Sequence, residues 1–572
     1  MSSAKIPSIF LSLIVALCAV FSPGRALAAK EYTTDYHSVY RLLPSGKTEV
    51  THGVSIKNNL ANIYATDYTI VIGASSLETI EVKDESGSIN PEISVSENQT
   101  KISFPLGNPA IGKDAIKNIV ISYVDPDVVT HAGLIWEINI PRLSNASDID
   151  KYVRELRVPL DFAEASLMLP EPKVEEDEQS RIYIWEGNKT ESITLFFGAF
   201  QLYRLGLKYT LTNPTLQSIE TEIAIPPDTE YQRITIGNIT PPPQKIVQDP
   251  DGNWLGVYSL EKQQKLGVSA TLYAKVSALP TFELKYPSDN KNFSNLTNKT
   301  KYWNYDSSSV STLAKQLKTP RNIYSYLVDT FTYNYSRVTS GGGRLGAEEA
   351  LKNPTLAICT EFTDAFIALA RASGIPAREI NGFAFTSNPS LRPVELTTDV
   401  LHAWPEYYDK ELGSWIQLDP TWGNTTGGVD YFSKLDFNHI AFVRRGLEDN
   451  YPYPAGAYKE TPDKSVQVEI VSVSPEEKLQ IEVIRQGDTT LLKNTGNVSA
   501  LNYTVSLDGK DYTIAYLPPY GVETVSSNQL SLDGKKVTYL AEGLLGLVLV
   551  TLVFGLIRTV KARKKNRVVN HS

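Results

Sequence analysis

The chain has 572 residues, of which 42% are hydrophobic and 21% are charged. This composition is typical of a globular protein and excludes a disordered one, and the length predicts roughly three or four domains. The formal net charge of −9 argues against a nucleic-acid partner, because phosphates would repel the protein surface.

The N-terminus has the parts of a secretory signal peptide, which we predict over residues 1–28. A positive charge is followed by an apolar run, Ile9 to Phe21, that is too short to span a bilayer, and Ala26-Leu27-Ala28 offers small residues for cleavage. An uncleaved anchor is the alternative. Cleavage would remove Cys18 and leave Cys359 as the single cysteine, so no intrachain disulfide is expected.

Polar and apolar residues alternate between residues 31 and 168, and turn signals recur. Val50, Val54 and Ile56, for example, share one face of a predicted strand. Short alternating strands with frequent turns predict an antiparallel β-sandwich over 31–168. The acidic run 175–178, preceded by prolines, is interpreted as the end of this domain.

Residues 181–284 are again rich in strand patterns, which predicts a second β-rich domain. The segment 249–253 carries acidic residues at alternate positions. It lacks the spacing of an EF-hand, so a surface turn is favoured over a calcium loop. The polar stretch 287–300 is interpreted as a linker.

Helical periodicity begins after this linker, in a domain predicted over residues 305–448. Apolar residues within 310–317 share one helix face, and Thr319-Pro320 predicts the start of the next helix. A further helix is predicted to begin at Cys359 and to end before Gly374.

Cys359 is the first candidate for chemistry in this domain. A thiol at a helix N-terminus faces unsatisfied N–H groups and the positive end of the helix dipole, and both favour the nucleophilic thiolate. The structural alternative is a small buried hydrophobic residue, a common role for cysteine.

Two predicted strands follow that helix, and a polar turn over 409–412 joins them. The first strand carries His402 and the second carries Asp419. If Tyr408 pairs with Gly413 across the turn, antiparallel counting places the imidazole directly opposite the carboxylate. Such a pair would hold the imidazole in one tautomer and stabilise its cation.

Structural interpretations of these residues stay open. A strand histidine is often a satisfied core or surface residue, and Asp419 precedes a proline, as a turn-initiating residue does. Trp404 and Trp415 are interpreted as core aromatics, with walls of a substrate groove as the alternative. His439 is the other histidine of this domain. We interpret it as structural, with a role as the catalytic base as the alternative.

Several sequence blocks of this domain occur in a recognisable order. They are CTEFTDAFIALARASGIPAR at 359–378, Asn381-Gly382-Phe383, His402-Ala403-Trp404-Pro405-Glu406 and Trp415-Ile416-Gln417-Leu418-Asp419-Pro420-Thr421. Together they resemble the core of the transglutaminase-like superfamily, over roughly residues 305–445. The resemblance implies a papain-like α+β fold, in which Cys359 is the nucleophile, His402 the general base and acid, and Asp419 the residue that orients the histidine.

Two positions depart from the family pattern. Ala357 stands where a glycine often precedes the cysteine by two residues, and Pro405 follows the His-Ala-Trp run in place of a strand-forming residue. We expect an altered loop at the first position and disturbed strand pairing at the second. The β-rich flanks resemble the sandwich modules that accompany such domains in outward-facing microbial proteins.

The C-terminal part returns to short strands over residues 465–530, which predicts a small β-sandwich stalk. Val537 to Ile557 has the length of a transmembrane helix. Six basic residues follow within 558–572 and favour a cytoplasmic tail, so the bulk of the chain is expected to face outward. A buried core helix or a sortase-type anchor fits these features less well. Asn-x-Ser/Thr triplets, clustered at 292–298, are compatible with a glycoprotein.

We therefore predict a multidomain α+β protein with β-sandwich domains on both sides of a papain-like transglutaminase core and one C-terminal transmembrane helix. The expected function is that of an extracytoplasmic, membrane-anchored thiol enzyme that transfers or hydrolyses acyl groups of protein or peptide amides through a thioester at Cys359. An ordinary peptidase is one alternative, and an inactive binding or envelope-structure module is another. No pattern of metal ligands or nucleotide binding occurs, so we expect no metal and no cofactor.

Overall fold

The computed structural model describes residues 30–526, apart from 97–98, 141–148, 188–192, 282–294, 341–342, 387–400, 427–428, 434, 461–462, 488 and 508. The predicted signal peptide, membrane helix and basic tail lie outside the described residues. Across the described part of the chain, every helix is too short or too polar to cross a membrane. The chain divides into two compact units. Unit 1 comprises Met1–Thr130, Ile138–Ala163 and Met168–Thr194, and unit 2 comprises the rest.

Unit 1 contains an eight-stranded sheet with the strand order β13-β14-β11-β1-β2-β8-β4-β5. Residues of β2 are alternately buried and half-buried, so the predicted period-two pattern is confirmed there. The strands of this sheet are β1 (Tyr32–Leu42), β2 (Thr48–Asn58), β4 (Glu78–Asp84), β5 (Gly87–Ile89), β8 (Ile116–Asp125), β11 (Lys151–Pro159), β13 (Lys173–Glu176) and β14 (Ser180–Glu186).

Two smaller sheets complete the N-terminal β-structure. The first has the order β3-β7-β6 and the second the order β12-β15-β10-β9. Their strands are β3 (Asp67–Ile72), β6 (Glu92–Ser96), β7 (Gln99–Pro105), β9 (Val129–Ala132), β10 (Ile135–Ile140), β12 (Ala165–Leu169) and β15 (Ile193–Phe197).

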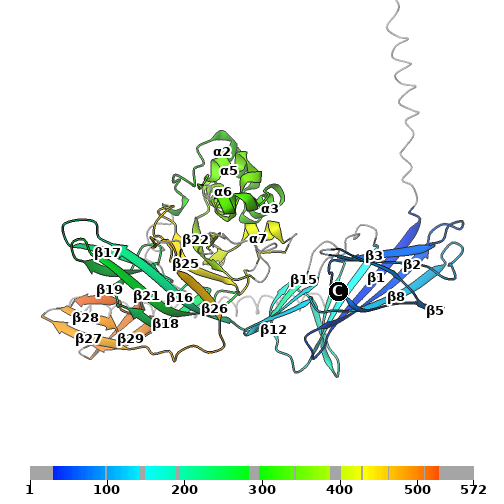
Figure 1. Cartoon of the computed structure of the whole chain (residues 1–572), viewed down its shortest axis with the longest axis horizontal. Coiled ribbons are helices and arrows are strands. Elements are labelled where there is room, and N and C mark those ends of the chain that lie inside the picture. Colours follow the sequence, from blue (N-terminus) through cyan, green and yellow to red (C-terminus); the bar gives the residue numbers. More distant parts are fainter. Residues whose placement is uncertain are drawn as a thin grey trace, which may run out of the picture. The chain divides into compact units, whose positions relative to one another are not determined.

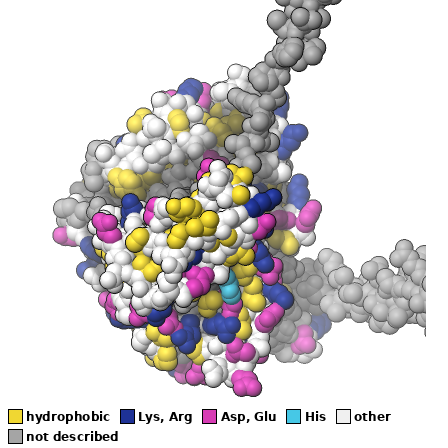
Figure 2. Space-filling model, turned by 90° about the vertical axis from the view of Figure 1, so that its right-hand side faces the viewer, with side chains coloured by type: hydrophobic (Ala, Val, Ile, Leu, Met, Phe, Trp, Pro, Cys, Tyr) yellow, Lys and Arg dark blue, Asp and Glu magenta, His cyan; other side chains and the backbone are white. Residues whose placement is uncertain are grey.

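On the face drawn in Figure 2, acidic and basic side chains are intermixed rather than gathered by sign.

The acidic run at 175–178 is not a domain boundary, contrary to the prediction. Its first residues belong to β13, which pairs with β14, and β14 pairs with β11 of the same sheet. Arginines on the neighbouring strands neutralise the run: Arg181 Nε donates to Glu176 Oε1 at 2.9 Å, and Arg157 Nη1 donates to Asp177 Oδ2 at 2.9 Å. The first β-domain therefore extends past residue 168, and the second does not begin at 181.

Unit 2 contains a β-sandwich built from two sheets, β18-β21-β16-β26 and β17-β20-β19. Apolar side chains of both sheets, such as Leu272 and Trp254, share one core. The strands are β16 (Gln201–Thr212), β17 (Ile219–Ile225), β18 (Gln232–Thr240), β19 (Lys245–Gln248), β20 (Trp254–Leu260), β21 (Lys265–Val276) and β26 (Val466–Ile470).

The predicted start of the C-terminal stalk at residue 465 is wrong. Strand β26 pairs with β16, with Val466 opposite Leu207, so this segment completes the sandwich of unit 2. The strands that follow form separate small sheets, β27-β28-β31 and β29-β30. They are β27 (Ile481–Gln486), β28 (Thr489–Asn494), β29 (Ala500–Leu507), β30 (Lys510–Leu517) and β31 (Val522–Ser526).

The segment 249–253 is a turn, as predicted, in which the Gly252 N–H donates to the Asp249 carbonyl oxygen at 3.0 Å, but its residues 251–253 are buried rather than on the surface. Asp251 Oδ2 accepts the backbone N–H groups of Gly446 and Leu447 at 2.9 and 3.1 Å. Asn253 is fully buried, and its Oδ1 accepts the backbone N–H of Arg444 at 2.7 Å. These polar side chains fasten the sandwich to the end of a strand in the helical domain.

The helical domain has a four-stranded sheet with the order β24-β23-β22-β25. Figure 1 shows α2, α3, α5 and α6 together on one side of strands β22 and β25. The strands are β22 (Ala377–Ala384), β23 (His402–Asp409), β24 (Ser414–Gln417) and β25 (His439–Arg445). The helices are α2 (Ser308–Leu317), α3 (Pro320–Thr330), α4 (Tyr335–Ser340), α5 (Ala347–Lys352), α6 (Cys359–Ala372) and α7 (Pro420–Thr425), with short 3-10 turns η2 (Asn295–Thr297) and η3 (Pro354–Leu356).

The predicted helix starts are confirmed. Thr319 Oγ1 accepts the backbone N–H of Asn322 at 3.2 Å, and Pro320 occupies the first turn of α3, where no N–H is needed. Helix α6 begins at Cys359 and ends before Gly374, which takes a φ of +76°. Residues around the whole circumference of α6 are buried, so α6 is the central helix of the domain.

The predicted register of the β23–β24 hairpin is wrong. Tyr408 pairs with Trp415 rather than with Gly413, and Asp409 pairs with Ser414. Gly413 lies in the loop instead, with a φ of +64° that glycine adopts readily. The loop thus keeps the predicted four residues but is shifted by one, to 410–413, and Asp409 Oδ1 holds it by accepting two of its backbone N–H groups at 2.9 and 3.0 Å.

Candidate active site

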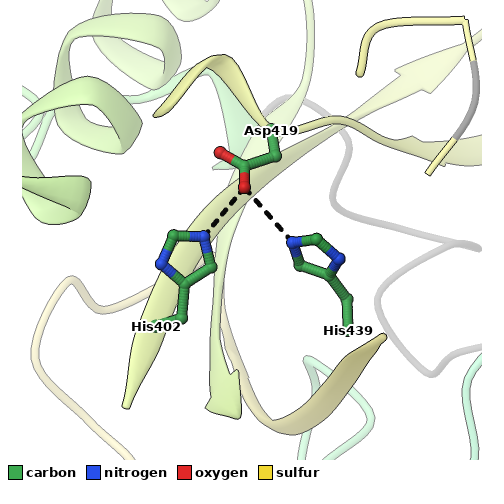
Figure 3. A group of neighbouring side chains, drawn as sticks. All are labelled: His402, Asp419 and His439. Atoms are coloured by element: carbon green, nitrogen blue, oxygen red, sulfur yellow. Dashed lines mark hydrogen bonds and ion pairs between the residues drawn. The ribbon is translucent and has the colours of Figure 1, made fainter. Parts of the chain in front are cut away.

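His402 and Asp419 meet, although not through the predicted strand pairing. The ladder between β23 and β24 ends at the Glu406–Gln417 pair and reaches neither residue. Asp419 lies beyond β24, at the residue that caps helix α7. From there its Oδ2 lies 2.9 Å from His402 Nε2 (Figure 3). The turn out of the strand, rather than the hairpin register, brings the two groups together.

Pro405 contributes to the early end of the ladder between β23 and β24. It pairs with Glu379 of β22, and its carbonyl oxygen accepts the backbone N–H of Leu418 at 3.2 Å. The N and O atoms of one strand residue point to the same neighbour, so the missing proline N–H removes a hydrogen bond toward β24. The expected disturbance therefore occurs on that side alone, where the ladder ends, while the pairing with β22 continues.

The carboxylate of Asp419 is buried and has hydrogen bonds at both oxygens. Its Oδ1 caps α7 by accepting the backbone N–H groups of Thr421 and Trp422 at 2.8 and 3.1 Å. Its Oδ2 accepts from two imidazoles, those of His402 and His439. A carboxylate held by the start of a helix has one position, which fixes the imidazoles that donate to it.

His439 belongs to this site, although sequence reasoning left it outside. It is the first residue of β25, and its Nε2 lies 3.2 Å from Asp419 Oδ2 (Figure 3). Its Nδ1 lies 2.7 Å from Asp436 Oδ1. Both ring nitrogens therefore donate to carboxylates, and neither keeps a lone pair, so His439 is not the base in this arrangement. The one signal in the sequence is the Asp-x-x-His spacing of residues 436 and 439.

Strand β22 separates the two histidines and holds them on one face. Gly382 pairs with His402 on one side, and Ala384 pairs with His439 on the other. Residues two apart in a strand share a face, so both imidazoles lie over small side chains. Their ring centroids are 5.6 Å apart.

Two buried tryptophans pack against the imidazoles. The His402 ring lies 5.8 Å from Trp404 and 5.4 Å from Trp422, nearly parallel to both, and the His439 ring lies 4.9 and 4.5 Å from the same two rings. Trp404 and Trp415 are both buried, as predicted for core aromatics. Trp404 therefore serves the core and the site together, and the low dielectric around the imidazoles strengthens their interaction with Asp419.

The charges of the site support one another. Burial alone would raise the pKa of Asp419, but the charges and hydrogen bonds of His402 and His439 outweigh it and hold that pKa well below its usual range. Burial alone would lower the pKa of His439, but Asp436 and Asp419 raise it to about 9. His439 is therefore an imidazolium at neutral pH, as its two carboxylate partners require.

Cys359 is buried at the first position of α6, as the sequence predicted. Helix α6 packs against β23, the strand that begins with His402. When His402 is neutral and donates from Nε2 to Asp419, its lone pair lies on Nδ1, and this buried nitrogen has no hydrogen-bond partner in the structure. The imidazole thus has an unused acceptor on the domain that carries the thiol.

The segment that leads into Cys359 is held by buried Glu361. This carboxylate accepts the backbone N–H groups of Ile358 and Leu345 at 3.1 and 2.9 Å, and Arg337 Nη1 donates to it at 3.0 Å. Ala357 takes φ −74° and ψ 138°, an extended conformation open to any residue. The backbone at position 357 therefore does not require glycine, and alanine fits there without a change in the loop.

The spacing of the donor atoms in this site is also short enough for a metal ion, because one donor atom from each of His402, Asp419 and His439 lies within 4.8 Å of the others. Both histidine Nε2 atoms are directed at Asp419 Oδ2 as hydrogen-bond donors. A cation would have to replace the protons on both nitrogens, and the second nitrogen of His439 is bound to Asp436. The arrangement suits proton transfer and charge stabilisation better than metal binding.

Comparison with known proteins finds a family match for part of the helical domain. Residues 305–420 match the model of the transglutaminase-like superfamily core. The uncharacterized protein YebA of Bacillus subtilis is 31% identical over 105 residues, which are 17% of this chain and 14% of that protein. A protein-glutamine gamma-glutamyltransferase of Pseudomonas aeruginosa is 28% identical over 107 residues, 18% of this chain and 16% of that enzyme. The chain thus spans about one seventh of the length of these curated relatives.

A solved structure, that of a candidate cysteine protease from Cytophaga hutchinsonii, is 16% identical and aligns with 48% of this chain and 98% of its own length, with a TM-score of 0.28. The family match agrees with the resemblance of the sequence blocks around Cys359, His402 and Asp419.

Proposed function

Because residues 305–420 form a transglutaminase-like superfamily domain within a larger, mostly β protein, we propose that this domain is a thiol enzyme that acts on amide bonds of proteins or peptides. Cys359 is the nucleophile, His402 is the general base and acid, and Asp419 orients His402. The products are acyl-transfer products when an amine completes the reaction, and hydrolysis products when water does.

One observation carries this proposal. The His402 imidazole is fixed at Nε2 by Asp419, and its buried Nδ1 is left as an unused acceptor on the strand against which the Cys359 helix packs. An imidazole oriented by a carboxylate and ready to accept a proton is the partner that a nucleophilic thiol needs.

In the proposed reaction, His402 Nδ1 takes the proton of the Cys359 thiol, and the sulfur attacks the carbonyl carbon of an amide. The C–N bond then breaks, and the same proton passes from His402 to the departing amine. A thioester remains on Cys359. Water or a second amine next attacks the thioester and gives a proton to His402, the C–S bond breaks, and His402 passes that proton to the Cys359 sulfur, which restores the thiol. Asp419 stabilises the imidazolium in each half of the reaction.

The glutamine side chain is the amide that we favour as substrate, because a relative with 28% identity over 107 residues is named a protein-glutamine gamma-glutamyltransferase. Hydrolysis of peptide bonds is the other outcome of the same chemistry. Access of water to the thioester decides between the two, since both reactions begin with the same attack.

The test is turnover by the purified full-length chain, supplied with a glutamine-rich protein and a labelled primary amine. We expect ammonia release and amine incorporation, and we expect both to disappear in Cys359→Ala and His402→Ala. New peptide N-termini without amine incorporation would identify a peptidase instead. Activity that persists in Cys359→Ala would contradict the assignment of the nucleophile.

The burial of Cys359, with a side chain only 1% exposed, favours a second candidate. In that case the domain is a catalytically inactive transglutaminase-like module that serves binding or envelope structure. This candidate predicts that the folded chain turns over no amide substrate. It also predicts that substitution of Cys359 does not affect the biological role of the domain.

We further propose that the protein is anchored in the cell membrane with its bulk outside the cytoplasm. The support is the apolar stretch 537–557 followed directly by a basic tail, and the signal-like N-terminus. Protease added to intact cells should digest the domain and spare a C-terminal tag. Protection of the domain from the protease would contradict this orientation.

A further inference from the structure

We infer that His439, held by Asp436, is a positioning residue that carries a positive charge at neutral pH beside Asp419 and thereby limits how strongly Asp419 attracts a proton to His402. This inference rests on the proposed function of Cys359 and His402. It assigns a role to two residues, Asp436 and His439, that lie outside the Cys-His-Asp set.

The hydrogen bonds determine the charge of His439. Its Nδ1 lies 2.7 Å from Asp436 Oδ1 and its Nε2 lies 3.2 Å from Asp419 Oδ2, and its ring is buried. An ionised carboxylate only accepts hydrogen bonds, so both nitrogens carry protons. The resulting cation is compensated on both sides, as a buried charge requires.

The cation and His402 share one oxygen atom. Asp419 Oδ2 accepts from His402 at 2.9 Å and from His439 at 3.2 Å. With His402 neutral, the two carboxylates and the His439 cation sum to one negative charge, which the protonation of His402 neutralises. Without the cation the sum is two negative charges, and the imidazolium of His402 would be held more tightly.

Other titratable groups near His439 are few among the described residues. Tyr203 of β16 donates through its hydroxyl to Asn438 Oδ1 at 3.1 Å, and burial raises its pKa well above the usual value, so it stays neutral. The two carboxylates and His402 are therefore the charged or chargeable groups that set the protonation of His439.

The first test is the pH profile of kcat/KM for amine incorporation in the full-length chain. His439→Gln keeps a side-chain donor toward Asp419 but removes the charge. We expect its acidic limb to move to higher pH by about 1 to 3 units, because His402 must lose its proton before it can accept that of the thiol, and in this variant it keeps its proton to higher pH. His37→Gln is the matched control, since His37 also faces a carboxylate, Glu155 at 3.1 Å, but on β1 of unit 1. An acidic limb that stays in place or moves to lower pH would overturn the inference.

The second test needs no turnover. NMR of the histidine ring nitrogens in the full-length chain should show one ring that keeps both protons at pH 8, and this signal should be missing in His439→Gln. If His439 is neutral at pH 8, the inference alone fails, even with full activity. If wild-type protein shows no turnover at all, the proposed function fails with it, so the two failures are distinguishable.

Discussion

Gly382 of β22 approaches the backbone of Ile440 in β25 so closely that a Cβ atom at position 382 would collide with the Ile440 carbonyl oxygen. The strand register shifts between Asn381 and Gly382, next to this approach. On the two sides of the same stretch of β22 lie His402 and His439, which reach over it to one oxygen of Asp419. The closeness of these strands is therefore part of the site geometry.

Gly382→Ala should separate β22 from β25 and loosen the contact of His439 with Asp419. We expect a loss of stability of about 1–3 kcal/mol, because a methyl group is forced against backbone, together with reduced kcat/KM. Urea unfolding and turnover measure the two effects. Gly267→Ala on β21 is the matched control, since a Cβ there would meet nothing within 4 Å. Equal effects of the two substitutions would contradict this account.

Asp419→Asn should retain the start of α7 and lose activity. Asparagine caps helices as well as aspartate does, but its amide would direct a donor or a weaker acceptor at the two imidazoles. We expect kcat/KM to fall by about 10³- to 10⁴-fold, as for the loss of an orienting carboxylate in other triads. Asp409→Asn, which alters a carboxylate that accepts two backbone N–H groups of a loop, should leave the rate nearly unchanged. A similar loss in both variants would point to damage of the fold.

The stability that His439 contributes should depend on pH. Its pKa is raised to about 9 in the folded protein, above the value of roughly 6.5 for an unfolded histidine. The contribution is therefore fully present below pH ~6.5 and is lost as the pH rises through about 9. The difference in unfolding free energy between the wild type and His439→Gln should shrink across this window. A difference that stays constant with pH would rule out a charged His439.

Glu406, on the strand that carries His402, forms a buried ion pair with Arg378 of β22. Both side chains are fully buried, so Glu406→Gln removes one charge of a buried ion pair and should destabilise the domain by about 3–5 kcal/mol. Glu460→Gln removes an exposed partner of Lys265 and should cost less than about 1 kcal/mol. Comparable small effects in urea unfolding would mean that the Arg378 charge finds compensation elsewhere.

The sequence predicted those features of the domain that are determined by residues close together in the chain. The cap at Thr319, the helix start at Cys359 and the stop at Gly374 each follow from residue types within one or two turns of a helix. The contact between His402 and Asp419 was also expected, but its cause was not. The contact arises because Asp419 caps α7. The observed hairpin register differs from the predicted one, because Gly413 lies in the loop and is not paired with Tyr408.

His439 could not be placed in the same way. Its position depends on the pairing of β25 with β22, strands that are distant in the sequence, and no local pattern fixes that register. The acidic run at 175–178 was misinterpreted for a related reason. Its charges are compensated by Arg157 and Arg181, which only the folded sheet brings beside them.

The central claim is that His402 activates the thiol of Cys359, and alkylation of Cys359 tests it most directly. Iodoacetamide labelling of the full-length chain is followed by mass spectrometry across pH in the wild type and in His402→Ala. We predict that wild-type labelling persists below about pH 7, well under the ordinary thiol pKa of about 8.5, and that His402→Ala moves its onset toward that value. A thiol that reacts identically in both proteins, or only after unfolding, would contradict the account.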